Sequence, residues 1–140
     1  MWKLLDWCLK NFFRDNCASF IVDDGKWLDT YGKIKFSLSH SNEMVAVGVS
    51  KECSIGVDIE MCSEKILKLS SILENITDED NFIESLTKKW TEKESLFKSR
   101  NGTTFNSKVV CDALKNNYVL TVCSCCENVD FIEINLENIV

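Results

Sequence analysis

Two acidic residues, Asp58 and Glu60, are separated by a single apolar residue in the stretch Ile55-Gly56-Val57-Asp58-Ile59-Glu60. Because side chains alternate between the two faces of a strand, both carboxylates would project from one face and Val57 and Ile59 from the other. Carboxylate oxygens are good ligands for a hard cation such as Mg2+. The pattern therefore indicates either a divalent-metal pair or an acidic strand that faces solvent, since charged residues are usually exposed.

A second pair of charges lies in the stretch Trp90-Thr91-Glu92-Lys93-Glu94-Ser95-Leu96-Phe97-Lys98, where Glu94 and Lys98 would share one helical face. An exposed ion pair at this spacing stabilises a helix by about 0.2 to 0.5 kcal/mol and requires no further function. Trp90 precedes Glu94 by one turn and would hold the same side toward protein. On a partly covered face, a carboxylate and an ammonium could instead bind a charged ligand.

His40 is the only histidine of the chain, and it lies between Ser39 and Ser41 at the end of an expected strand. A lone histidine is more often a hydrogen-bonded structural residue than a catalytic one. The hydroxyls, the imidazole and nearby backbone N–H groups could nevertheless bind an anion together.

The eight cysteines lie mostly in apolar segments, and the amino-terminal stretch has no continuous apolar region of the kind found in a signal peptide. We therefore expect reduced, buried thiols in a cytoplasmic protein. The stretch Cys123-Ser124-Cys125-Cys126 lacks the paired C-x2-C spacing of structural zinc sites, so we favour buried thiols there over a zinc site.

The composition is that of one folded domain covering residues 1–140, because 45% of the residues are hydrophobic and 27% are charged. The net charge of −6 argues against broad binding of nucleic acid, which needs clustered Lys and Arg. The amino-terminal apolar stretch is too short and too charged to span a membrane. We expect neither nucleic acid nor a membrane as a partner.

The elements that must position these residues follow from apolar periodicity. Spacing of apolar residues from Trp2 to Phe13 predicts a first helix that ends near Asp15 or Asn16. Alternation over residues 34–38 predicts a strand, and the five residues between the apolar run 44–49 and the acidic stretch suit an antiparallel hairpin of those two.

Two helices are expected next, from Ser63 to about Asn75 and from a cap at Thr77 to near Arg100. Three later segments have a strand pattern: Val109-Val110, Tyr118 to Cys123, and residues 131–134. The order of elements predicts an α+β fold in which an antiparallel sheet is packed with helices.

Taken together and in order, three stretches resemble the consecutive motifs of the 4′-phosphopantetheinyl transferases of the surfactin-synthetase-activating type. They are Phe36-Ser37-Leu38-Ser39-His40-Ser41, the acidic stretch 55–60, and the helical stretch 90–98. The resemblance extends from about Gly25 to Cys123 and implies the fold of that family. Since 55 residues precede Gly56, the amino-terminal lobe would be incomplete, and self-association could complete the pocket.

The resemblance implies transfer of 4′-phosphopantetheine from coenzyme A to a serine of an apo acyl or peptidyl carrier protein, with Mg2+ as cofactor and 3′,5′-ADP as product. Asp58, Glu60 and Glu94 match the metal ligands of the family. Glu94 also matches the proposed general base, and Lys98 matches the lysine that holds a pyrophosphate oxygen.

The remaining matches concern coenzyme A. Lys93 occupies the position of a second basic residue beside the phosphates, and Ser39 and His40 match contacts to the ribose 3′-phosphate. Lys26 falls in a turn near the adenine, although Trp27 replaces the proline of the family. Lys88 and Lys89 are candidates for docking an acidic carrier. A shortened non-catalytic relative that binds coenzyme A or a carrier, and another Mg2+-dependent phosphate hydrolase, are the alternatives.

Overall fold

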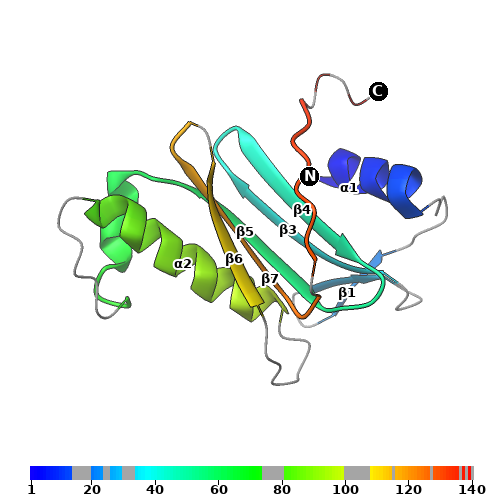
Figure 1. Ribbon diagram of the computed structural model, residues 1–140, viewed down its shortest axis with the longest axis horizontal. Helices are drawn as coiled ribbons and strands as arrows, with labels where there is room; N and C mark the ends of the chain where they lie inside the picture. Colours follow the sequence, from blue (N-terminus) through cyan, green and yellow to red (C-terminus); the bar gives the residue numbers. More distant parts are fainter. Residues whose placement is uncertain are drawn as a thin grey trace.

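The computed structural model of the chain describes residues 1–13, 20–23, 26–29, 34–73, 81–99, 108–114, 116–126, 128–135, 137 and 139. They form an α+β fold of small antiparallel sheets with helices beside them, as predicted (Figure 1). The elements are α1 (Trp2–Cys8), the π-helical turn η1 (Leu9–Phe13), β1 (Phe20–Asp23), β2 (Lys26–Asp29), β3 (Lys35–Ser41), β4 (Met44–Ser50), β5 (Ile55–Met61), the 3-10 helix η2 (Glu64–Leu69), α2 (Phe82–Ser99), β6 (Lys108–Leu114) and β7 (Tyr118–Ser124).

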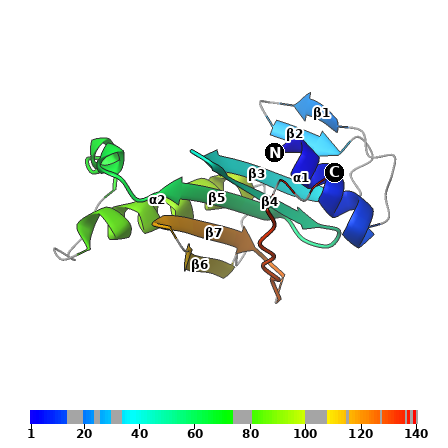
Figure 2. The same ribbon diagram turned by 90° about the horizontal axis from the view of Figure 1, so that it is seen from above.

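The first helical region buries only part of the predicted apolar face, because Trp2 and Phe12 are exposed. Leu5 and Leu9 are buried together with Ile34, and they pack against the outer face of the β3–β4 hairpin. Figure 2 shows α1 and the β1–β2 hairpin at the opposite end of the molecule from α2. The predicted end of the helix, at Asp15 or Asn16, lies outside the described residues.

β3 and β4 form a hairpin that is joined by a two-residue turn at Asn42 and Glu43. Their register runs from Lys35 opposite Ser50 to Ser41 opposite Met44, and Asn42 adopts a positive φ of 48°. Asparagine tolerates this left-handed conformation, which suits a tight turn. The predicted hairpin between residues 44–49 and 55–60 is therefore wrong, because the short turn pairs β4 with β3.

β5 pairs instead with β7, which lies between β5 and β6 in a three-stranded antiparallel sheet. One face of β5 enters an apolar cluster formed by Ala46, Val57, Ile59, Tyr118 and Val122. α2 packs along β5 and β7 (Figure 1).

α2 approaches the sheet closely at Gly56. A Cβ atom at this position would lie 2.6 Å from the backbone nitrogen of Ser99. The residues that α2 buries are mostly small and polar, and four of them recur at intervals of four: Thr87, Thr91, Ser95 and Ser99. This small face lets the helix lie against β5, on the side to which Gly56 and Asp58 project.

Two predicted elements differ from the structure. The helix expected from Ser63 is a short 3-10 helix, Glu64–Leu69, and the Ser63 side chain makes no capping hydrogen bond. The strand expected at 131–134 is absent, since no strand occurs within residues 128–135. Thr77, the expected cap of α2, lies outside the described residues. Within the described part of the chain, no helix is both long and apolar enough to cross a membrane.

Candidate functional site

Serine side chains join β3 to the edge of β5. Three hydroxyls on one face of β3, called the serine row, each accept a hydrogen bond from a backbone N–H group of β5. The bonds run from Val57 to Ser37 (2.9 Å), from Ile59 to Ser39 (3.2 Å) and from Met61 to Ser41 (3.1 Å). Because these N–H groups would otherwise be unsatisfied at a covered strand edge, the serine row fixes β3 onto β5.

Asp58 is buried, with 5% of its surface exposed. Its Oδ1 atom accepts hydrogen bonds from the Ser39 hydroxyl at 2.8 Å and from the Lys98 ammonium at 2.7 Å. The interpretation of a solvent-facing acidic strand is therefore wrong for Asp58. The buried carboxylate is compensated by a charge-assisted contact, as a buried anion requires.

Lys98 contacts β5 through two acceptors. Its Nζ atom donates to the backbone carbonyl of Val57 at 3.3 Å as well as to Asp58. Its side chain is 28% exposed, so this ion pair lies between the interior and solvent. Within the described residues, the ammonium pairs with β5 and not with Glu94 on its own helix. The simple i,i+4 surface pair is therefore not formed.

Glu60 is half-buried, and its Oε1 atom accepts a hydrogen bond from the Ser41 hydroxyl at 2.8 Å. β5 is a regular strand over this stretch, so Asp58 and Glu60 project from one face, as the sequence predicts. Both carboxylates are held by the serine row.

The direction of α2 follows from its contacts with β7. The hydroxyls of Thr91 and Thr121 are 2.7 Å apart, and Ser99 donates to the Cys123 sulfur at 3.3 Å. In the β5–β7 register, Thr121 lies opposite Asp58 and Cys123 lies opposite Gly56. The helix therefore runs antiparallel to β5.

This direction places Glu94 relative to the carboxylates of β5. Glu94 precedes Lys98 by one helical turn on the same side of α2, which displaces it toward the Glu60 end of β5. It is half-buried, whereas Lys93 is exposed. Glu94 thus lies on the side of α2 from which Lys98 reaches Asp58.

The donor set is suited to a hard cation in its chemistry, because Asp58, Glu60 and Glu94 all offer carboxylate oxygens. Within the described residues, no three His, Cys, Asp or Glu side chains are gathered closely enough to hold a metal ion. The Lys98 ammonium instead lies at Asp58 Oδ1, the same oxygen that accepts the Ser39 hydroxyl.

The two residues matched to the ribose 3′-phosphate are separated by the strand. Ser39 is buried against β5, whereas His40 is exposed and projects from the opposite face of β3. The geometry thus brings Ser39, but not His40, to Asp58. The side chain of Lys26, in β2, lies outside the described residues. Lys88, a candidate for carrier docking, forms an i,i+4 ion pair with Glu84 at 2.6 Å.

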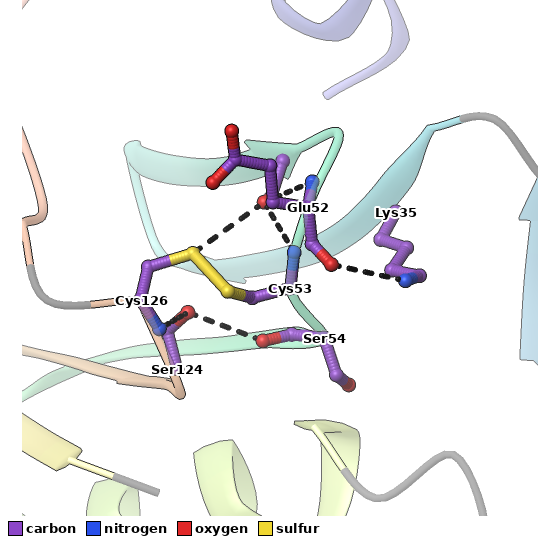
Figure 3. The surroundings of a disulfide bond; sticks show 7 residues. Lys35, Glu52, Cys53, Ser54, Ser124 and Cys126 are labelled. Atoms are coloured by element: carbon purple, nitrogen blue, oxygen red, sulfur yellow. Dashed lines mark hydrogen bonds between the residues drawn. A yellow bond between two sulfur atoms is a disulfide. The ribbon is translucent and has the colours of Figure 1, made fainter.

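Cys53 and Cys126 form a disulfide, which corrects the expectation of reduced thiols for these two residues (Figure 3). Cys8, Cys62, Cys123 and Cys125 are not disulfide-bonded, and Cys62 and Cys123 are buried as expected. The β5–β7 register places Ile55 opposite Ser124, and its continuation by two residues places Cys53 opposite Cys126. Their Cα atoms are 5.9 Å apart, as a disulfide requires. The bond removes Cys126 from the residues considered for zinc.

The disulfide lies within a hydrogen-bonded turn. The Ser50 hydroxyl accepts from the backbone N–H groups of Glu52 and Cys53, and the Ser124 hydroxyl donates to the Ser54 carbonyl at 3.2 Å. Figure 3 shows Glu52, Ser54 and Ser124 around the two sulfur atoms. Together they join the β4–β5 connection to the segment that follows β7.

Ser37, Ser41, Thr91 and Thr121 organise the site, but of these four the sequence pointed only to Ser41, as a possible anion contact. A serine at every second position of a strand was a usable signal for the first two, because these hydroxyls share one face. The two threonines gave no comparable signal, since their contact joins residues that are 30 apart in sequence.

No model of a known protein family matches the chain, and no curated protein is significantly similar to it in sequence. The functional interpretation therefore depends on the three motifs and on the contacts between the elements that carry them.

Proposed function

We propose that the chain is a 4′-phosphopantetheinyl transferase with a fold like that of the family, which moves the 4′-phosphopantetheine group from coenzyme A to a serine of an apo acyl or peptidyl carrier protein. The observation that carries this proposal is the contact of all three motifs at Asp58. This residue belongs to the second motif, and it binds Ser39 of the first and Lys98 of the third.

Asp58, Glu60 and Glu94 would hold Mg2+, which when bound neutralises charge on the diphosphate oxygens of coenzyme A. Glu94 would accept the proton of the carrier serine as its oxygen bonds to the phosphorus that bears the pantetheine arm. The bond from this phosphorus to the bridging diphosphate oxygen breaks, and 3′,5′-ADP leaves. The reaction requires mainly positioning and charge neutralisation.

Lys98 would have a different partner in each state. In the structure its ammonium neutralises Asp58 at 2.7 Å. A diphosphate offers this ammonium a more highly charged partner, so coenzyme A would draw Lys98 from Asp58 to a phosphate oxygen. Asp58 would then be free to bind the cation that accompanies the diphosphate.

The other positions matched to coenzyme A have unequal support. Lys93 is exposed at one side of α2, where it could reach a phosphate. His40 is also exposed, and could contact the 3′-phosphate only from the outer face of β3. Self-association could supply further contacts to the nucleotide.

Incubation of the chain with coenzyme A, Mg2+ and an apo carrier protein tests the proposal. We expect the carrier to gain the mass of phosphopantetheine while 3′,5′-ADP is released. Asp58→Asn and Glu94→Gln should each reduce the rate at least about 100-fold, because each replaces a carboxylate ligand of Mg2+ with a neutral amide and so weakens the neutralisation of the diphosphate charge. Asp6→Asn is the matched control, since Asp6 is an exposed carboxylate on α1.

Two results would overturn the transferase. Release of 3′,5′-ADP without a mass gain on the carrier would indicate a phosphate hydrolase. Binding of coenzyme A without turnover of any carrier would indicate a non-catalytic relative, in which the Lys98–Asp58 pair persists.

A further inference from the structure

The hydroxyls of Ser39 and Ser41 are each fixed by two hydrogen bonds. Ser39 accepts the N–H group of Ile59 at 3.2 Å and donates to Asp58 at 2.8 Å. A serine hydroxyl has a single proton to donate. Because the backbone N–H group occupies the acceptor side of the oxygen, that proton is directed to the carboxylate.

The same unit repeats two residues further along both strands. Ser41 accepts the N–H group of Met61 at 3.1 Å and donates to Glu60 at 2.8 Å. Ser39 and Ser41 are both 7% exposed. The two hydroxyls are therefore shielded from most of the solvent and have fixed partners.

Among the described residues, the first member of the serine row has no carboxylate partner. Ser37 accepts the N–H group of Val57 at 2.9 Å, but the β5 residue that precedes Val57 is Gly56. Ser37 is as buried as the other two, at 7% exposed. It therefore shares their contact with the β5 edge without a carboxylate.

We infer that Ser39 and Ser41 are positioning residues that orient Asp58 and Glu60 toward a divalent cation; the inference rests on the proposed function. A hydrogen bond to one oxygen fixes the carboxylate rotamer and leaves the second oxygen as a ligand. Partners of this kind behind a metal ligand typically change metal affinity 10- to 100-fold when removed. The geometry thus gives Ser39 a partner in Asp58 instead of the ribose phosphate.

Binding of Mn2+, used as a paramagnetic probe in place of Mg2+, tests this inference when it is measured by electron paramagnetic resonance in the presence of coenzyme A. Ser39→Ala and Ser41→Ala should each raise the Kd for Mn2+ about 10- to 100-fold. Ser37→Ala, the matched control, should change it less than about threefold, because it removes only the bond to the β5 edge. Ser39→Thr retains a hydroxyl and should recover most of the affinity.

Thermal unfolding of the variants separates structural damage from positioning. All three alanine variants should lose stability, since each leaves one β5 N–H group without its serine, and Ser39→Ala and Ser41→Ala should lose more than Ser37→Ala because each also removes a hydrogen bond to a carboxylate. Equal Mn2+ affinity in Ser39→Ala and Ser37→Ala would overturn the inference, and transfer by the unmodified chain would still support the proposed function. A different result would retain the inference and overturn the transferase: Mn2+ binds tightly, the binding weakens only in Ser39→Ala and Ser41→Ala, and no carrier protein is modified. No Mn2+ binding by the unmodified chain would overturn both.

Discussion

Replacement of Gly56 by alanine tests whether α2 depends on close approach to β5. The added Cβ would lie 2.6 Å from the backbone nitrogen of Ser99 and 3.0 Å from the carbonyl carbon of Ser95, with the Ser95 carbonyl oxygen nearer still. Van der Waals contacts between non-bonded carbon atoms are favourable from about 3.5 Å. Since these are backbone atoms of a helix, they cannot rotate away, and α2 must retreat by about 1 Å.

The energetic cost follows from two opposing contributions. Overpacking of a tight contact costs about 1 to 3 kcal/mol, while alanine stabilises by about 0.4 to 1 kcal/mol through the unfolded chain. The expected net loss is about 1 to 2 kcal/mol. With an unfolding entropy of about 2.1 cal/mol/K per residue, this corresponds to a fall in Tm of about 3 to 7 °C for a chain of this size.

Urea denaturation followed by circular dichroism measures the loss. Gly48→Ala is the control, because its Cβ would meet only side-chain atoms, with Val57 Cγ1 at 2.6 Å and Ile55 Cδ1 at 3.0 Å. These atoms can shift more readily than a helix backbone, so the control should lose less stability. A Gly56→Ala variant as stable as the unmodified chain, or no less stable than Gly48→Ala, would refute this account of the α2 contact.

Three further changes have defined expectations. Lys98→Met leaves Asp58 buried without its counter-ion, and should lower the free energy of unfolding by about 1 to 3 kcal/mol after allowance for the partial exposure of the lysine. In urea denaturation, adding Asp58→Asn to Lys98→Met should recover part of this loss. Additive losses of the two substitutions would contradict the pairing. Cys53→Ser opens a loop with a sequence separation of 73 and should cost about 4 kcal/mol in the chain-entropy estimate, as measured by urea denaturation. Cys125→Ser, at an exposed free thiol, should cost little, and equal losses would count against the disulfide. Burial raises the pKa of the Cys8 thiol, so the thiolate forms at higher pH in the folded chain than in the unfolded chain, and the free energy of unfolding falls as the pH rises past the pKa of the unfolded thiol. Iodoacetamide should therefore modify Cys8 more slowly than Cys125 at pH 8, as measured by peptide mass analysis. A faster reaction at Cys8 would contradict its burial.

Local periodicity was sufficient to predict the strand that carries Asp58 and Glu60 and the helix that carries Glu94 and Lys98. The alternation in residues 55–60 predicted a strand with both carboxylates on one face, and β5 has that form. The helical spacing around Trp90 predicted the helix that places Glu94 and Lys98 one turn apart. Such patterns depend on neighbours within one or two turns, so the sequence contains them directly.

The partners of these elements depended on tertiary structure. Lys98 and Asp58 are 40 residues apart, and Cys53 and Cys126 are 73 apart. The disulfide follows from the pairing of β5 with β7, and the ion pair follows from the packing of α2 along β5. The short connection after β4 had instead favoured the pairing of β5 with β4. The choice between these strands depends on how α2 and the serine row cover β5. The N–H groups at the edge of β5 need hydrogen-bond acceptors, and its face needs an element to pack against. The sequence alone thus determined which face of β5 is acidic, and the tertiary structure determined that this face lies against a lysine and a row of serines.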